Sequence, residues 1–228
     1  MPESSAISAF GFRISFGFRP SAFGFRGFGV CLVWLAFLPA LSKVFPCKAM
    51  KNLVYFDLET QRSADEVGGW DHIAAMGLSV GVTYSTARGD YRIYGEKQVN
   101  ELIQELQRAD LVVGFNNLRF DYEVLHGYTA LDLRQLPTLD LLVELQNKLQ
   151  HRLSLDAIAT ATFGLEKTAE GLQAIRWFRE GKLLEIAEYC CYDVKLTRLV
   201  HEYGAQHRQL HYRNRFGKKL TVPVSWQA

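Results

Sequence analysis

The fold is decided by residues 52–60, which read NLVYFDLET. The stretch NLVYFDL is rich in strand-forming side chains and predicts a buried β-strand. Because side chains alternate between the two faces of a strand, Asp57 and Glu59 share one face at its carboxyl end. Acids beside the apolar residues 54–56 are costly to bury unless a partner such as a divalent cation compensates them. A strand end whose acids are simply solvated is the alternative.

A second apolar stretch, LVVGF at residues 111–115, predicts another strand, and Asp121 follows it. If the two strands are neighbours, Asp121 approaches Asp57 at the same edge of the sheet. Sites in open α/β sheets gather beyond the carboxyl ends of the strands, which agrees with this placement. Aspartate is also a common helix cap, and a helix is expected to begin near Phe120 or Asp121. Both roles can hold together.

The last long helix, expected at residues 182–203, contributes a further acid. Tyr189 and Asp193 are four positions apart, which places both on one face of a helix. The alternative is an interior tyrosine with an exposed aspartate at ordinary helical spacing. Each acidic pattern taken singly has such a structural explanation, and the combination of the three patterns is what points to a shared site.

The other patterns predict one α/β domain with a mixed sheet. Short connections between the first three strands favour antiparallel neighbours, and the helix after the third strand permits a crossover to a parallel partner. Residues 65–76 form an excursion between strands, and Pro137–Asp140 lead into a helix. The expected elements are strands at 52–58, 77–85, 91–95 and 111–115, a turn at 87–90, and helices at 97–108, 140–149, from Ser154 onward and at 182–203.

Three motifs follow one another in a fixed order: FDLET at residues 56–60, Asn117 with Phe120-Asp121, and Tyr189 with Asp193. This order resembles the DEDD (DnaQ-like) superfamily of 3′–5′ exonucleases, in the subclass whose third motif is YxxxD. The resemblance covers residues 52–203 and implies a ribonuclease-H-like fold, with a mixed five-stranded sheet flanked by helices. It further implies a metal-dependent exonuclease that hydrolyses phosphodiester bonds of nucleic acid, most readily at a single-stranded 3′ end.

The resemblance also implies two Mg²⁺ or Mn²⁺ ions and a role for each side chain. Hard divalent cations prefer oxygen ligands, and a pair of them stabilises the attacking and leaving oxygens at phosphorus. Asp57 would bridge the ions, Glu59 and Asp193 would hold the ion that activates water, and Asp121 would serve the second ion. Tyr189 would orient the nucleophile, because an unperturbed tyrosine is a poor base at neutral pH.

Substrate contacts beyond the metals are expected at Asn117, at Lys167, and at Arg213 and Arg215. Asn117 serves equally well to stabilise a turn, and Lys167 is also an ordinary surface lysine. The two arginines belong to a basic stretch at residues 207–219 that can track phosphates or form a solvated hairpin. We expect Trp70 and Trp177 to pack in the core or against loops rather than to stack on bases.

Charge and cysteine content limit the classes of function. The net charge of +2 is unevenly placed: residues 1–49 hold five of the 26 basic and one of the 24 acidic residues, so residues 50–228 carry −2. Nucleic-acid binding must therefore rely on local patches or bound metal. The four cysteines, Cys31, Cys47, Cys190 and Cys191, form neither a disulfide framework nor a zinc motif. Buried thiols in a reducing cytoplasm are the expected state.

Residues 1–49 differ from the rest of the chain. The tetrapeptide FGFR occurs at residues 10–13, 16–19 and 23–26, and nine of the fifteen Phe precede Met50. This low-complexity tract can be translated sequence upstream of a true start at Met50, a disordered or weakly membrane-associating leader, or an export signal. The first is favoured, because Met50 stands two residues before a clean strand. We expect residues 50–228 to be the exonuclease domain, cytoplasmic and without a membrane span.

Other functions fit parts of the same pattern. The main alternative is a non-catalytic nucleic-acid-binding or partner-docking module on the same fold, because a fold alone never establishes activity. A ribonuclease-H-like endonuclease is a second alternative, and it would cut circular strands that lack an end. A phosphatase with an aspartyl nucleophile fits badly, because residues 57–59 supply Asp-Leu-Glu instead of the usual DxD.

Overall fold

The computed structural model describes residues 51–165 and 171–226. These residues belong to one compact unit, Lys48–Ala228. The expected leader at residues 1–49 and the expected phosphate contact Lys167 lie outside the described residues. Within the described ranges, no helix is both long enough and apolar enough to cross a bilayer.

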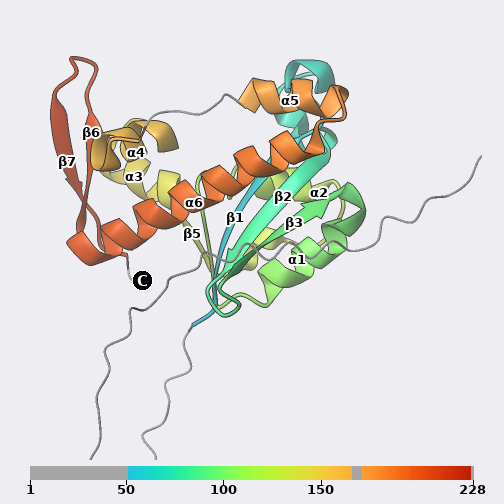
Figure 1. Cartoon of the computed structure of the whole chain (residues 1–228), viewed down its shortest axis with the longest axis horizontal. Helices are drawn as coiled ribbons and strands as arrows, with labels where there is room; N and C mark the ends of the chain where they lie inside the picture. The colour runs from blue at the N-terminus through green and yellow to red at the C-terminus, as the bar shows by residue number, and fades with distance from the viewer. Residues whose placement is uncertain (1–50, 166–170, 227–228) are drawn as a thin grey trace, which may run out of the picture. The chain divides into compact units, whose positions relative to one another are not determined.

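A five-stranded mixed sheet forms the centre of the unit, which confirms the predicted fold class (Figure 1). The strand order is β3-β2-β1-β4-β5. β1 pairs with β2, and β2 with β3, in antiparallel fashion, whereas β4 runs parallel to β1 and β5 runs parallel to β4. The strands are β1 (Leu53–Thr60), β2 (Leu78–Ser85), β3 (Asp90–Gly95), β4 (Leu111–Gly114) and β5 (Thr138–Asp140).

Helices cover both faces of this sheet. The longest, α6, lies on one face of the sheet and crosses β1 and β2, as Figure 1 shows. The α-helices are α1 (Val99–Gln107), α2 (Asp121–His126), α3 (Leu141–Leu149), α4 (Leu155–Phe163), α5 (Gly171–Arg179) and α6 (Leu183–His207). Short 3₁₀ helices are η1 (Asp65–Val67), η2 (Trp70–Ala75), η3 (Glu96–Gln98) and η4 (Leu133–Gln135). A hairpin of β6 (Gln209–Arg213) and β7 (Lys219–Pro223) follows α6.

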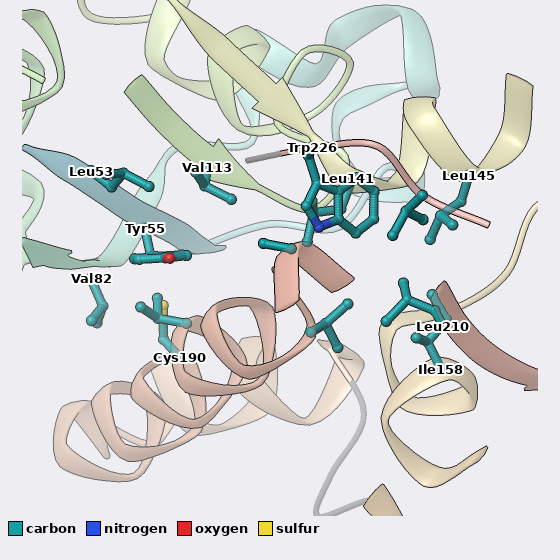
Figure 2. Packing of buried hydrophobic residues seen from close by; sticks show 14 of the residues in the cluster. Leu53, Tyr55, Val82, Val113, Leu141, Leu145, Ile158, Cys190, Leu210 and Trp226 are labelled. Carbon is teal, nitrogen blue, oxygen red and sulfur yellow. The ribbon is translucent and has the colours of Figure 1, made fainter. Parts of the chain in front are cut away.

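Two hydrophobic cores follow from the alternation of side chains along β1. Leu53 and Tyr55 point into the core beneath α6, together with Val82, Val113 and Cys190 (Figure 2). The intervening residues Val54, Phe56 and Leu58 point into the opposite core, which α1, α2 and η2 complete. The face of β1 that carries Leu53 and Tyr55 is therefore the face on which Asp57 and Glu59 continue, below α6.

Two elements were not anticipated from the sequence. Residues 138–140 form the edge strand β5, where only an approach to a helix was expected, and α5 has no counterpart among the expected helices. The basic stretch near residue 210 is a hairpin. Its Leu210 and Val222 are buried in the core beneath α6, so the hairpin is part of the packed unit and not only a solvated loop.

Candidate functional site

Three carboxylates from distant parts of the chain meet below α6. Oxygens of Asp57, Glu59 and Asp193 all lie within 4.8 Å of one another. Asp57 and Glu59 reach this point because they share one face of β1, and Asp193 reaches it from the middle of α6. All three residues are partly buried. The three side chains thus form one acidic cluster, which we call the acid centre.

Asp121 lies next to the acid centre but is held by the backbone. It is buried, and its Oδ1 accepts a hydrogen bond from the amide of Leu58 at 3.1 Å. Asp121 is the first residue of α2, and the N-cap position belongs to Phe120, which makes no side-chain capping bond. The side chain therefore ties α2 to β1. The negative charge of Asp121 is close enough to Asp57 to raise the pKa of that carboxyl.

Burial and mutual repulsion make the ionised form of this cluster unfavourable. Burial, followed by the charges of Asp121 and Asp193, raises the pKa of Asp57 well above its ordinary value. Burial and the charge of Asp193 raise the pKa of Glu59 in the same direction. Burial raises the pKa of Asp121 to about 8. Among the described residues, no lysine or arginine forms an ion pair with Asp57 or Glu59.

Tyr189 stands one helical turn before Asp193 on α6. Burial, together with the charges of Asp193, Glu59 and Asp57, raises the pKa of its phenol. The aromatic ring packs edge-on against Trp177, with 6.4 Å between ring centroids. The expectation that Trp177 packs against its surroundings agrees with this contact. The raised pKa favours the protonated phenol, which can donate a hydrogen bond.

Cys190 contacts the acid centre, a role that no sequence pattern indicates. Its side chain is fully buried, and its Sγ lies 3.4 Å from Oδ2 of Asp57 and 3.3 Å from the backbone oxygen of the same residue. Both distances are compatible with a thiol that donates to Asp57. Cys190 is a free thiol, as expected, and its position directly before the turn that carries Asp193 brings it under β1.

The structure places Asn116 and Asn117, which follow β4, in different surroundings. Asn117 is 1% exposed, and its Nδ2 donates to the backbone oxygen of Phe56 at 3.2 Å, so its side chain joins the turn after β4 to β1, which agrees with the expected structural alternative. Gly114 is needed beside it, because a Cβ there would lie 1.5 Å from Oδ1 of Asn117. The neighbouring Asn116 lines the adjoining cleft, with a left-handed backbone (φ 76°) and its amide bound to Asp140.

A cleft of about 610 Å³ opens over the acid centre. Asp57, Glu59 and Asp121 line it, together with residues of the β1–β2 connection and of α5. A further cavity of about 390 Å³ lies on the side of Asp193, and Asp57 lines both spaces. The acids are therefore accessible to a molecule that enters either cavity.

The other expected contacts lie elsewhere. Arg213 and Arg215 belong to the β6–β7 segment, and neither lines the cavities at the acid centre. Figure 1 shows this hairpin beyond α3 and α4, at the end of the unit away from α5. Trp70 is 64% exposed and does not pack in the core, but its ring contacts Phe120 in the turn before α2, in agreement with the expected alternative of packing against a loop. It stands at the edge of the cleft over the acid centre.

The donor set of the acid centre fits hard divalent cations. Oxygen ligands alone are what Mg²⁺ and Mn²⁺ prefer, and close carboxylates with raised pKa values need either protons or cations between them. Asp57, Glu59 and Asp193 are the residues positioned to share one ion. Asp121 is less available, because one of its oxygens already accepts the amide of Leu58.

A model of the RNase_H superfamily matches residues 54–204, which include Asp57, Glu59, Asp121, Tyr189 and Asp193. A search among curated proteins found no match.

Two solved structures are similar to this chain. The family B DNA polymerase from the hyperthermophilic archaeon Pyrobaculum calidifontis is 14% identical at a TM-score of 0.51, over 68% of this chain and 24% of that chain. RNase D from Trypanosoma brucei is 16% identical at a TM-score of 0.49, over 68% of this chain and 57% of that chain. The chain thus spans less than two thirds of the length of either protein. At these identities the likeness concerns the fold.

Proposed function

The chain belongs to the RNase_H superfamily, and from this premise we propose that it is a metal-dependent 3′–5′ exonuclease of the DEDD, DnaQ-like group and of its YxxxD subclass. One observation carries the proposal: Asp57, Glu59 and Asp193 converge within 4.8 Å in an open cleft, with Asp121 beside them. These four acids and Tyr189 appear in the order that this group of enzymes requires. We assign the domain to residues 50–228.

Asp57, Glu59 and Asp193 would hold one Mg²⁺ or Mn²⁺ ion, and Asp57 with Asp121 would serve a second. When bound, such ions supply Lewis-acid stabilisation of the charge that develops at a phosphodiester. The free oxygen of Asp121 remains for this role, since only Oδ1 accepts the amide of Leu58. Cys190 helps to hold Asp57 in place through its thiol.

The protein's own groups account for positioning and for the proton. Tyr189 keeps its phenolic proton, because burial and three nearby acids raise its pKa, and it orients a water molecule by donating a hydrogen bond. Asn117 is a positioning residue. It joins the loop after β4 to β1, and thereby sets the position of Asn116 at the cleft. Lys167, Arg213 and Arg215 are proposed to contact phosphates of the substrate; Arg213 and Arg215 would do so away from the cleft.

The proposal is tested with strands that differ only in their ends. The full chain is incubated with end-labelled single-stranded DNA and RNA, with either the 3′ or the 5′ terminus blocked, in Mg²⁺, in Mn²⁺ and in EDTA. We expect stepwise release of nucleotides from an open 3′ end in the presence of a divalent ion. A blocked 3′ end should prevent the release, and a blocked 5′ end should not.

Each other outcome identifies a different function. Cleavage that is indifferent to the 3′ block removes the stated polarity, and cleavage of a circular strand indicates an endonuclease. Binding of strands without any cleavage, and without any change in Asp57→Ala, indicates the non-catalytic module. Asp57→Ala is the required control, because its residual activity measures contamination by other nucleases.

A further inference from the structure

Trp70 is unusually exposed for a tryptophan. Its side chain is 64% exposed, although tryptophan is among the more buried residue types on average. It is the first residue of η2, in the excursion between β1 and β2. Ile73 and Met76 of the same excursion are buried and anchor it to the core. The excursion is therefore held without the indole of Trp70, and packing gives no reason for a tryptophan at this exposed position.

The backbone fixes the position of Trp70. Gly68 and Gly69 precede it with φ values of 91° and 118°, which residues other than glycine rarely adopt. The amide of Gly69 donates to the backbone oxygen of Ala64 at 2.7 Å, which closes the turn before η2. The indole lies against the ring of Phe120, with 6.3 Å between ring centroids. The exposed face is therefore held in place before any ligand arrives.

Trp70 stands between two spaces. It lines the cleft over the acid centre, and it also lines a second cavity of about 400 Å³ with Ile73, Asn116, Arg119, Phe120 and Arg152. Asn116 and Phe120 are shared by the two spaces in the same way. Arg152 further lines the cavity that holds Asp57 and Asp193. A chain molecule can therefore extend from the acid centre past Trp70 into this second cavity, which we call the indole pocket.

The lining of the indole pocket fits a nucleotide. Two aromatic rings offer faces on which a base can stack, and two guanidinium groups offer donors for a phosphate. Arg119 and Arg152 form no ion pair with a carboxylate in the described ranges, and no acid is among the described residues that line this pocket. Arg152 makes only a 3.3 Å hydrogen bond to Oδ1 of Asn116 there.

We propose that the indole pocket binds a nucleotide adjacent to the cleaved one, with Trp70 stacked on its base and with Arg119 and Arg152 on its phosphate. The inference rests on the proposed function and names its substrate class: strands whose bases near the cleaved bond are unpaired. A base within a duplex has both faces covered by its neighbours, so it offers Trp70 no free face.

Binding is measured in the full chain with Asp57→Asn as the background, because that variant keeps the pocket and does not cleave. A fluorescent single-stranded oligonucleotide is titrated at fixed salt and followed by anisotropy. Stacking on one base contributes about 1–3 kcal/mol, so we expect Trp70→Ala to weaken binding roughly tenfold. Trp70→Phe should recover most of the loss. Ile93→Ala, which removes another exposed apolar side chain, is the matched control and should bind unchanged.

A strand with one abasic position separates stacking from a general defect. Moving the abasic position along the strand should reveal one place, near the 3′ end, where the missing base costs roughly tenfold in affinity. Trp70→Ala should lose nothing further at that place, because base and indole act as a pair. Equal losses for intact and abasic strands, or equal binding of a blunt duplex, would overturn the proposal.

The arginines provide an independent measurement. Arg119→Gln and Arg152→Gln should each reduce the slope of log K against log salt by about 0.7, the value for one contact to a single-stranded phosphate. A slope of log K against log salt equal to that of the parent would show that no phosphate is bound in the indole pocket. If the wild-type chain cleaves no strand while these couplings are present, the proposed activity fails and the nucleotide pocket stands. If it cleaves strands without any coupling to Trp70, the activity stands and the nucleotide pocket fails.

Discussion

Two groups of buried carboxylates lie on opposite faces of the sheet, and they differ in how the cost of burial is compensated. Glu105 of α1 accepts hydrogen bonds from Thr83 at 2.9 Å, from Tyr94, and from Arg88 at 2.6 Å. Arg92 lies at 3.9 Å from the same carboxylate. The acid centre instead gathers Asp57, Glu59 and Asp193 within 4.8 Å, with the buried carboxyl group of Asp121 nearby.

The difference separates structural from functional carboxylates. A buried acid that is paired and hydrogen-bonded is compensated by its partners, and removing one partner alone destabilises the fold. Acids that repel one another destabilise the fold, and they persist where a bound cation compensates them. Asp140 belongs to the first kind, because it accepts the amides of Asn116, Leu118, Leu142 and Val143.

The largest expected effect is on activity, in Asp57→Asn. Loss of a ligand shared by two ions should lower the rate of cleavage roughly a thousandfold or more. The same variant should be more stable than the wild type in EDTA, because one repelling charge is gone. Cleavage and thermal unfolding, measured on the same preparation, check both parts. A variant that is inactive and also less stable in EDTA would contradict the comparison.

The next effect is on stability, in Glu105→Gln. This change removes the more buried of the two acidic partners of Arg88, the other being Asp90, and should lower the free energy of unfolding by roughly 2–4 kcal/mol. Urea denaturation measures the loss. Cleavage per folded molecule should stay at the wild-type rate at a temperature well below the transition, since Glu105 lies on the other face of the sheet. Loss of activity without loss of stability would place Glu105 in the site after all.

The smallest effect is on the pH dependence of stability in EDTA. The pKa of Asp121 is raised to about 8 in the folded chain, whereas an unfolded aspartate titrates near 3.9. The folded state holds this proton where the unfolded state has lost it, so the contribution to stability falls as pH rises between the two values. We expect a loss of roughly 2–3 kcal/mol from pH 5 to pH 7, measured as the difference between wild type and Asp121→Asn. A difference that grows in the opposite direction would contradict the raised pKa.

Much of the fold could be predicted because the signals are periodic. Alternation along residues 52–60 fixes the faces of β1, and the helical spacing of Tyr189 and Asp193 fixes one face of α6. β5 has only three residues, too few for any periodicity to register, and its backbone pairing with β4 is set by tertiary contacts. The other four strands and the mixed order were therefore predictable, while this edge was not.

The sequence indicated the acidic residues of the site, but it did not indicate how the residues around them are arranged. Asn116 and Asn117 are chemically identical neighbours, and only the turn that places Asn116 at φ 76° decides which of them faces the cleft. Trp70 was expected to pack in the core or against a loop, and the sequence did not indicate which; its ring lies against Phe120 and is 64% exposed, after two glycines with positive φ. Cys190 meets Asp57 only through the packing of α6 on β1, which no local pattern encodes.

The central claim is that the acid centre exists to hold divalent cations, and direct titration of Mn²⁺ tests it most simply. The full chain and its Asp57→Asn and Glu105→Gln variants are titrated by calorimetry in the absence of nucleic acid. We predict saturable binding of up to two ions in the wild type and in Glu105→Gln, and binding at least roughly tenfold weaker in Asp57→Asn. No saturable binding to the wild type, or equal affinity in Asp57→Asn, would contradict the claim.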